Sequence, residues 1–223
     1  MIDCFILGSK STDRKELMEK SGLVPLVVLP GDYPEREEDE VNNPARLAEI
    51  LASKKAQNVL DKLRLAIKKE GFLASLPIPK DTKVATLVLV TADTVVSLKS
   101  EVIGKAEDAD EAFQILQRLQ GQVHKLITAY CLKAIEFDIM AQSLKELTSK
   151  TGGTATRVKF NHLDSQQIRA YIETGEWKGR AGCYAIQLQA SKFVRSIEGS
   201  HSGVIGLPVA EIIADLHAMG LDV

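Results

Sequence analysis

One stretch constrains the fold of this chain more than any other, because a carboxylate stands inside a long apolar run. The residues Val84–Val90 read as a buried strand and continue directly into TADTVV, residues 91–96. Burying an ionised carboxylate without a partner costs on the order of several kcal/mol or neutralises the group. Asp93 therefore has either a metal, a cation or a water to act on, or a structural role as a turn cap that accepts backbone hydrogen bonds. The stretch alone leaves both readings open.

Composition narrows the class of protein. The 223 residues can bury a substantial core, and 45% apolar with 26% charged residues is typical of a globular domain. A net charge of -2 argues against a partner such as nucleic acid or a membrane surface. Three scattered cysteines predict no disulfide framework, and no stretch approaches transmembrane length. We expect a cytoplasmic enzyme or binding domain.

The first loop of the chain has the character of an anion site. A strand expected over residues 1–7 runs into Gly8-Ser9-Lys10-Ser11-Thr12, and a helix is expected from about Asp13 to Ser21. Backbone N–H groups at such a helix start can face an anion. Arg14 and Lys15 oppose the helix dipole there unless something negative binds. The alternative is a plain N-capped helix with solvated basic residues.

A long helix expected over residues 44–71 carries one lysine in an unusual place. Projected at about 100° per residue, Lys55 lies inside the edge of the apolar arc, between Leu51 and Ala48. Such a lysine either extends its stem over apolar surface towards water or reaches a buried anion.

A hairpin brings a second lysine towards Asp93. The strand 84–98, a turn at Lys99-Ser100 and a return over residues 101–105 are expected. A two-residue turn places Thr94 opposite Lys105, whereas a three-residue loop places Asp93 there. Either register brings Asp93 and Lys105 within a residue of each other. A buried structural ion pair is the alternative to a functional pair.

The remaining pattern predicts a mixed α/β fold in a single domain spanning residues 1–223. A polar excursion over 138–153 is expected to hold a short helix, Met140–Leu147, and Gly179–Gly206 is rich in small residues. The other expected elements are a strand at 23–29, a helix at 108–119, strands at 123–137 and 154–160, a helix at 165–174, and a last helix from 208 to about 219.

Five stretches stand out along the chain: GSKSTDRKEL (8–17), TADTVV (91–96), VIGKAEDADEAFQILQRLQGQVHKLIT (102–128), AGCYAIQ (181–187) and IEGSHSGVIGLP (197–208). In this order they resemble motifs of the Maf family of nucleoside-triphosphate pyrophosphatases. The first is similar to ASxSPRRKEL, the second to GADTVV and the fourth to AGAYGIQ. The resemblance covers residues 4 to 216, apart from expected insertions near 72–82 and 138–153.

The resemblance implies a curved mixed β-sheet with flanking helices, two lobes that enclose a central cleft, and a homodimer. It also implies hydrolysis of a nucleoside triphosphate to the monophosphate and pyrophosphate by water attack at the α-phosphate. The expected substrates are dTTP, UTP or modified pyrimidine nucleotides, and the expected cofactor is a divalent metal cation, Mg²⁺ or Mn²⁺.

Residue by residue, the resemblance implies a site with catalytic, substrate-binding and metal-binding positions. Asp93 is the expected catalytic carboxylate and a metal ligand, and Glu35 is the expected second metal ligand. Lys105, at a position where the family contacts phosphates, is the second expected catalytic residue. Ser9, Arg14 and Lys55 are expected to contact the phosphates of the substrate. Thr94 and Gln187 are expected to take part in base selection.

One departure from the family pattern falls inside the site. Asp13, which is also counted among the expected substrate-binding residues, stands where the family has the first of two paired arginines. The aspartate is consistent with phosphate repulsion, with pairing to Arg14 or with metal binding. Two rival functions stay open. Asp13 favours a nucleotide-binding regulator of cell division without turnover, and the related fold also supports a pyrophosphatase for modified purine triphosphates.

Overall fold

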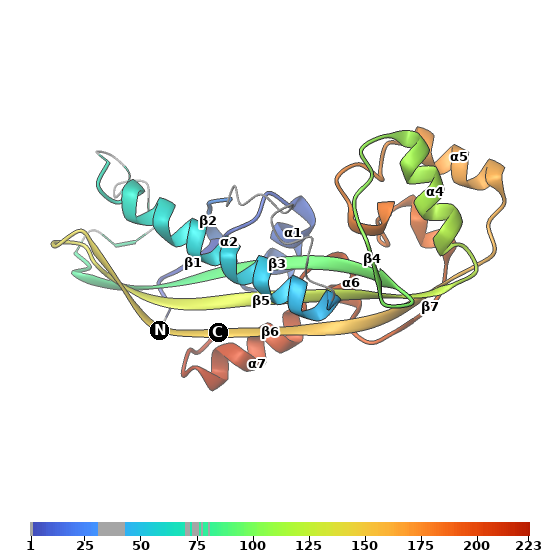
Figure 1. Cartoon of the computed structure of the whole chain (residues 1–223). Helices are drawn as coiled ribbons and strands as arrows, with labels where there is room; N and C mark the ends of the chain where they lie inside the picture. The colour runs from blue at the N-terminus through green and yellow to red at the C-terminus, as the bar shows by residue number, and fades with distance from the viewer. Residues whose placement is uncertain (1, 31–42, 70–71, 73–75, 77, 80) are drawn as a thin grey trace.

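The computed structural model describes residues 2–30, 43–69, 72, 76, 78–79 and 81–223 (Figure 1). Its centre is a curved, seven-stranded mixed sheet with the order β2-β1-β3-β5-β6-β7, and β4 pairs with β3. The strands are β1 (Cys4–Leu7), β2 (Pro25–Val28), β3 (Val84–Leu98), β4 (Glu101–Ile103), β5 (Val123–Asp138), β6 (Ser143–Phe160) and β7 (Val194–Glu198). β1 is parallel to β2 and to β3, and the other pairs are antiparallel. The mixed α/β class expected from the sequence is confirmed.

The apolar run of β3 serves two faces of the sheet, because successive side chains of a strand point in opposite directions. Leu87 and Leu89 belong to a core with helix α2 (Pro44–Ala66). Val88 and Val90 belong to a second core on the other face. A strand that is buried on both faces has apolar residues at successive positions, which explains the nearly continuous apolar sequence of residues 84–90.

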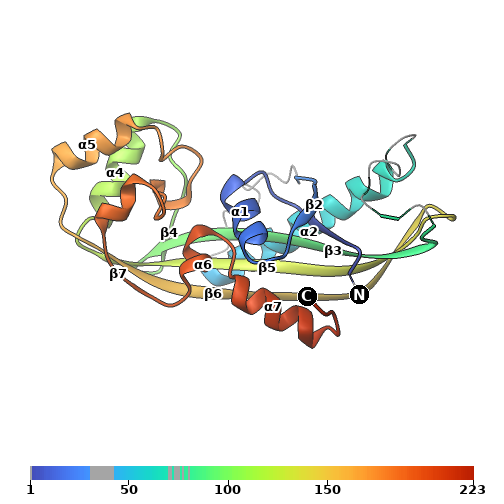
Figure 2. The ribbon, with the colours of Figure 1, turned by 180° about the vertical axis from the view of Figure 1, so that it is seen from behind.

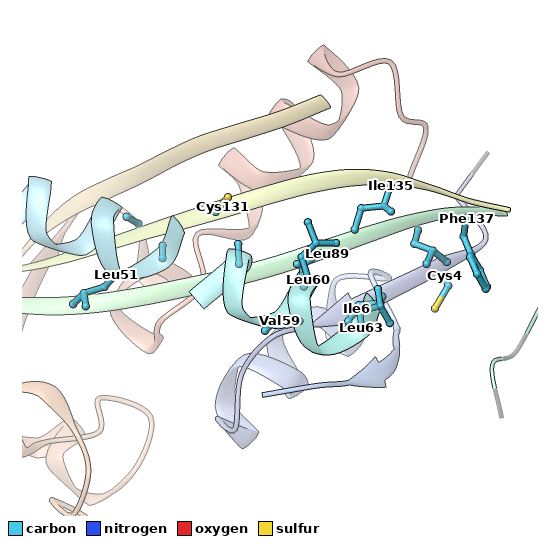
Figure 3. Packing of buried hydrophobic residues seen from close by; sticks show 14 of the residues in the cluster. Cys4, Ile6, Leu51, Val59, Leu60, Leu63, Leu89, Cys131, Ile135 and Phe137 are labelled. Atoms are coloured by element: carbon cyan, nitrogen blue, oxygen red, sulfur yellow. The ribbon is translucent and has the colours of Figure 1, made fainter. Parts of the chain in front are cut away.

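Helix α2 crosses one face of the sheet and buries one side against β1, β3 and β5 (Figure 3). Asn43 caps its start by accepting from the Ala45 and Arg46 N–H groups, and its first residue is Pro44. The helix ends at Ala66, earlier than the glycine expected to terminate it. On the opposite face lie α1 (Thr12–Lys20) and α7 (Val209–Ala218), whose buried side chains share one core (Figure 2).

The far end of the sheet carries a group of helices that we call the distal lobe. It consists of α4 (Ala109–Leu119), α5 (Ser165–Glu173) and the 3-10 turns η2 (Ala181–Cys183) and η3 (Gln189–Phe193) (Figure 1). The short helix α6 (His201–Ile205) leads from there back to α7. The elements α1, α2, β1 and β2 form the proximal lobe. A two-lobed arrangement on one curved sheet is therefore confirmed.

The helix expected over Met140–Leu147 is wrong. β6 begins at Ser143 and pairs with β5 along its whole length, with Leu144 opposite Phe137. The side chains of its first half are mostly exposed, so the segment lacks the apolar alternation that marks a strand. The ladder offered by β5 decides the structure against local propensity. β7, which also lacked a sequence signal, pairs with β6 in the same way.

The turn between β3 and β4 follows the two-residue alternative. Lys99 and Ser100 both have positive φ, 51° and 72°, as a type I′ hairpin requires. Leu98 is opposite Glu101, and the last ladder pair is Val96 with Ile103. Continued by two residues, this register carries the chain to Thr94 and Lys105.

Candidate active site

A gap in the sheet positions the site. β5 pairs with one edge of β3 from Val84 to Ser97. On the other edge, β1 pairs with β3 as far as Val90, and β4 pairs with β3 from Val96 onwards. Among the described residues, no strand lies beside residues 91–95 on that edge, and we call this interval the edge gap. Asp93 lies at its centre.

A cleft of about 710 Å³ opens at the edge gap. Its walls come from both lobes. The proximal lobe contributes the loop and first helical turn at residues 8–14, together with Lys55 of α2, and the distal lobe contributes residues 178–187. Asp93 and Thr94 of β3 line it as well. The central cleft expected from the sequence is confirmed.

Asp93 is paired with Lys55. The lysine Nζ donates to the Asp93 Oδ1, and the side chains are only 15% and 8% exposed, respectively. A hydrogen bond between two buried residues holds α2 against β3 next to this ion pair. The Thr91 hydroxyl donates to the Ala52 carbonyl of α2 at 2.8 Å. Lys55 follows Ala52 by about one helical turn, and Asp93 follows Thr91 on the same face of β3. Of the two readings of Lys55, the one that reaches a buried anion is confirmed.

Arg14 is held by acceptors from three parts of the chain. Its Nε donates to the Gly206 carbonyl at 2.8 Å, its Nη1 to the Ser9 hydroxyl at 3.2 Å and its Nη2 to the Thr94 hydroxyl at 3.3 Å. The helix that carries it is capped by Ser11, which accepts from the Arg14 N–H. Arg14 and Ser9 therefore meet in the cleft, as expected.

A buried hydroxyl relay extends this arrangement. Thr128 of β5 donates to the Gly203 carbonyl at 2.7 Å, so its single proton is used there. The Thr94 hydroxyl lies 2.8 Å from the Thr128 hydroxyl and must be the donor to it, while it accepts from Arg14. Thr128 carried no sequence signal, because its role depends on β5 lying beside β3. The Thr94 hydroxyl is therefore hydrogen-bonded to both Arg14 and Thr128.

Asp13 is paired with Arg180, which was not among the candidate residues. The Arg180 Nη1 donates to the Asp13 Oδ2. This differs from each of the three readings of Asp13 taken from the sequence, including pairing with Arg14. The signal that could have found Arg180 is weak: Lys178 and Arg180 stand just before the small-residue segment that begins at Ala181.

The described lining of the cleft is strongly cationic. Its positive side chains outnumber its carboxylates by six to two: Lys10, Arg14, Lys55, Lys105, Lys178 and Arg180 against Asp13 and Asp93. Positive side chains and a helix start converging on one cavity favour a multiply charged anion.

Apolar side chains also line the cleft. They are Leu126, Ile186, Val204 and Ile205, and the exposed side chain of Gln187 lines the cleft as well. Apolar side chains together with an amide suit a flat heterocycle better than another phosphate.

Tyr184, which also lines the cleft, and His124 form a neutral buried pair. The Tyr184 hydroxyl lies 2.8 Å from the His124 Nε2. Burial raises the pKa of Tyr184 well above its ordinary value, with a smaller contribution from Tyr171. Burial lowers the pKa of His124 from 6.5 to about 4. The pair therefore contributes no charge to the cleft at neutral pH.

The donor set decides what kind of metal site this cleft can form. The described residues contain no cluster of three or more His, Cys, Asp or Glu side chains that would cage an ion. Asp93 and Asp13 are the carboxylates of the described lining, and Glu35 lies outside the described residues. Mg²⁺ is commonly held by one or two carboxylates together with substrate phosphates. The chemistry of Asp93 fits an ion shared with a phosphate ligand.

The fold and the cleft define an α/β protein with a cavity lined by cations at an interrupted strand edge. Residues 4–219 match the family model described as Maf-like protein, and the chain belongs to that family. None of the described helices is long and apolar enough to cross a membrane.

Relatives of known name cover almost the same span. The chain is 33% identical over 204 residues to a dTTP/UTP pyrophosphatase of Ruminiclostridium cellulolyticum, covering 92% of this chain and 90% of the relative. It is 34% identical over 215 residues to a dTTP/UTP pyrophosphatase of Chelativorans sp., covering 96% and 90%. It is 35% identical over 207 residues to one of Alkaliphilus oremlandii, covering 93% and 91%.

Proposed function

We propose that this protein hydrolyses a nucleoside triphosphate to the nucleoside monophosphate and pyrophosphate, with dTTP and UTP as its substrates. The observation that carries the proposal is the nearly buried Asp93, held by Lys55, beneath a cleft whose described lining has six cations. A triphosphate has the multiple negative charge that such a lining favours. The names of the relatives at 33–35% identity support the same reaction.

In the proposed reaction, Asp93 acts on the attacking water. The water oxygen bonds to the α-phosphorus, the bond from that phosphorus to the α–β bridging oxygen breaks, and pyrophosphate leaves with that oxygen. The Asp93 carboxylate accepts the proton of the water as a general base. Lys55 holds the carboxylate in a single orientation, which supplies the alignment that an in-line attack needs.

The cations bind the phosphates and the charge that develops on the leaving group. Arg14, fixed by Ser9, Thr94 and Gly206, presents its guanidinium without further ordering. Lys105 lines the cleft beyond β4 and is assigned to the leaving pyrophosphate. Positive charge at these places stabilises the transition state more than the separated water and substrate.

A divalent cation, Mg²⁺ or Mn²⁺, is part of the proposal. Asp93 and Glu35 are its proposed protein ligands, with phosphate oxygens completing the shell. When bound, such an ion neutralises phosphate charge and polarises the phosphoryl oxygen.

The base is assigned to the apolar residues of the cleft lining. Leu126 and Ile186 offer a surface for a pyrimidine ring, and the Gln187 amide offers both a donor and an acceptor to its polar edge. The Thr94 hydroxyl is engaged with Arg14 and Thr128, so its influence on base choice is assigned to the placement of Arg14.

The deciding experiment incubates the purified protein with UTP, dTTP and magnesium and separates the products. The proposal requires equal amounts of monophosphate and pyrophosphate. Release of diphosphate and inorganic phosphate, or binding without turnover, would contradict it and would favour the regulatory alternative. Faster turnover of inosine triphosphate than of UTP would favour the modified-purine alternative.

A homodimer in the cytoplasm completes the proposal and rests on the family alone. Light scattering on the purified protein tests the dimer, with a single species at twice the mass of 24.4 kDa as the expected result.

A further inference from the structure

The ion pair of Asp13 and Arg180 joins the two sides of the cleft. Asp13 lies in the first turn of α1, in the proximal lobe, and Arg180 precedes η2 of the distal lobe. Both side chains line the cleft, and they remain 18% and 29% exposed, respectively. The pair is therefore accessible to a ligand that enters the cleft.

Asp13 occupies a place where an anionic ligand has to come close. Its neighbour Arg14 donates to the hydroxyl of Ser9, and both of these residues line the same cavity as Asp13. A carboxylate among these groups repels phosphate, unless its partner Arg180 offsets the charge. Arg180 itself presents the guanidinium fork that binds carboxylate and phosphate in the same geometry.

Exchange of one anion for the other is favourable here. A polyphosphate carries more negative charge than a carboxylate, so it competes well for the Arg180 guanidinium. Asp13 also has a second source of compensation, because it stands at the positive end of α1. Both side chains of the pair also keep contact with solvent, so water and the start of α1 can offset part of the charge of Asp13 when the pair opens.

On the basis of the proposed function, we propose that Arg180 is a phosphate-binding residue and that Asp13 competes with the substrate for it. The carboxylate holds Arg180 between turnovers. An entering polyphosphate takes the guanidinium from Asp13, and the departing pyrophosphate gives it back. The pair thus weakens the binding of substrate and product alike and favours product release.

The test measures the equilibrium binding of inorganic pyrophosphate by titration calorimetry, with magnesium present. Asp13→Asn removes the competitor, and we expect the Kd for pyrophosphate to fall by about tenfold, the worth of one charge-assisted hydrogen bond. Arg180→Gln removes the ligand and leaves Asp13 to repel, so we expect the Kd to rise by about tenfold or more. A gain of affinity in the first variant cannot arise from a failure to fold.

Matched variants separate this competition from a general effect of charge. Glu16→Gln removes the same charge from the exposed side of α1, where Glu16 pairs with Lys20, and should leave the Kd unchanged. Lys178→Gln removes a cleft cation two residues from Arg180 and should raise the Kd less than Arg180→Gln does. Unchanged or weaker binding in Asp13→Asn, or equal losses in Lys178→Gln and Arg180→Gln, would overturn the proposal.

The binding measurement is independent of turnover. A wild-type protein that bound pyrophosphate but hydrolysed no triphosphate would refute the proposed function, and the Asp13→Asn result would still decide on the competition. A wild-type protein that hydrolysed UTP while Asp13→Asn left the pyrophosphate Kd unchanged would refute the competition alone. Absence of pyrophosphate binding in both the wild-type protein and Asp13→Asn would refute the competition, and the turnover assay would then decide on the proposed function by itself.

Discussion

The Thr91 hydroxyl donates a hydrogen bond of 2.8 Å to the Ala52 carbonyl, and both residues are fully buried. This bond fixes the register between β3 and α2 immediately next to the site. Asp93 follows Thr91 on the same face of β3, and Lys55 follows Ala52 by about one turn of α2. These two residues form the ion pair of the cleft. The position of the charged pair thus follows from the packing of two uncharged neighbours.

Replacement of Asp93 by Asn should remove the proposed general base with little change in shape. We expect kcat for UTP to fall by about 100-fold or more, the lower end of what general acid–base catalysis contributes. The KM for UTP should change much less, because the cleft cations remain. Asp61→Asn, on the exposed side of α2, is the control and should behave as wild type. Near-normal turnover in Asp93→Asn would remove Asp93 from the mechanism.

Lys55→Gln should leave the Asp93 carboxylate without its partner. Loss of one member of a nearly buried pair destabilises the protein, so we expect a lower melting temperature as well as lower kcat/KM. In the double variant with Asp93→Asn the stability losses should not add, because both changes remove the same interaction. Lys54→Gln, at the adjacent exposed position, is the matched control. Additive losses would show that the two residues act independently.

Thr128→Val tests the hydroxyl relay beneath Arg14. The change leaves the Gly203 carbonyl without its donor and frees the Thr94 hydroxyl, at a cost of about 1–3 kcal/mol in the free energy of unfolding. Because Thr128 acts through Arg14, we expect the KM for UTP to rise several-fold with a smaller change in kcat. Thr128→Ser keeps the hydroxyl and should restore the KM. A serine variant as impaired as the valine variant would point to the lost methyl group instead.

The buried His124 predicts a pH dependence of stability. Its folded pKa of about 4 lies below the unfolded value of 6.5, so the unfolded chain takes up the proton first on acidification. The stabilising contribution is complete above about pH 6.5 and is lost as the pH falls towards 4, by about 3 kcal/mol in total. Chemical unfolding at a series of pH values measures this loss. His124→Phe should flatten the slope, and the exposed His217→Gln should not.

Gln187 should set the preference for the base. We expect Gln187→Ala to lower kcat/KM for UTP and dTTP towards the values for other triphosphates, because the amide contacts are lost while the apolar surface remains. A panel of canonical, methylated and deaminated triphosphates measures the change. Equal activity of the wild-type protein on the whole panel would exclude base recognition by this residue.

The site features that the sequence predicted are those set by nearby residues. Asp93 stood out because its strand is otherwise apolar, and Lys55 because helical periodicity placed it on the buried arc. The hairpin register followed from a two-residue turn. Each of these depends on a pattern within one element or on one short connection.

What escaped prediction depends on parts of the chain that only the fold brings together. Asp13 and Arg180 are 167 residues apart, and neither flank carries a pattern that names the other. Thr128 acquires its role from β5 lying beside β3, and the first half of β6 is a strand because β5 provides a ladder for it. Glu35, the expected second metal ligand, stays a prediction because it lies outside the described residues.

The edge gap also limits strand pairing at this edge of β3. An unpaired strand edge normally invites another strand, from a peptide or from a second copy of the protein. Here β1 covers this edge of β3 up to Val90 and β4 covers it from Val96. Among the described residues, only 91–95 are unpaired between these two strands, about 16 Å of strand at about 3.3 Å per residue. A longer extended peptide would collide with one strand or the other. The unpaired interval of β3 is therefore long enough for a compact ligand but too short for strand pairing to continue from one molecule to the next along this edge.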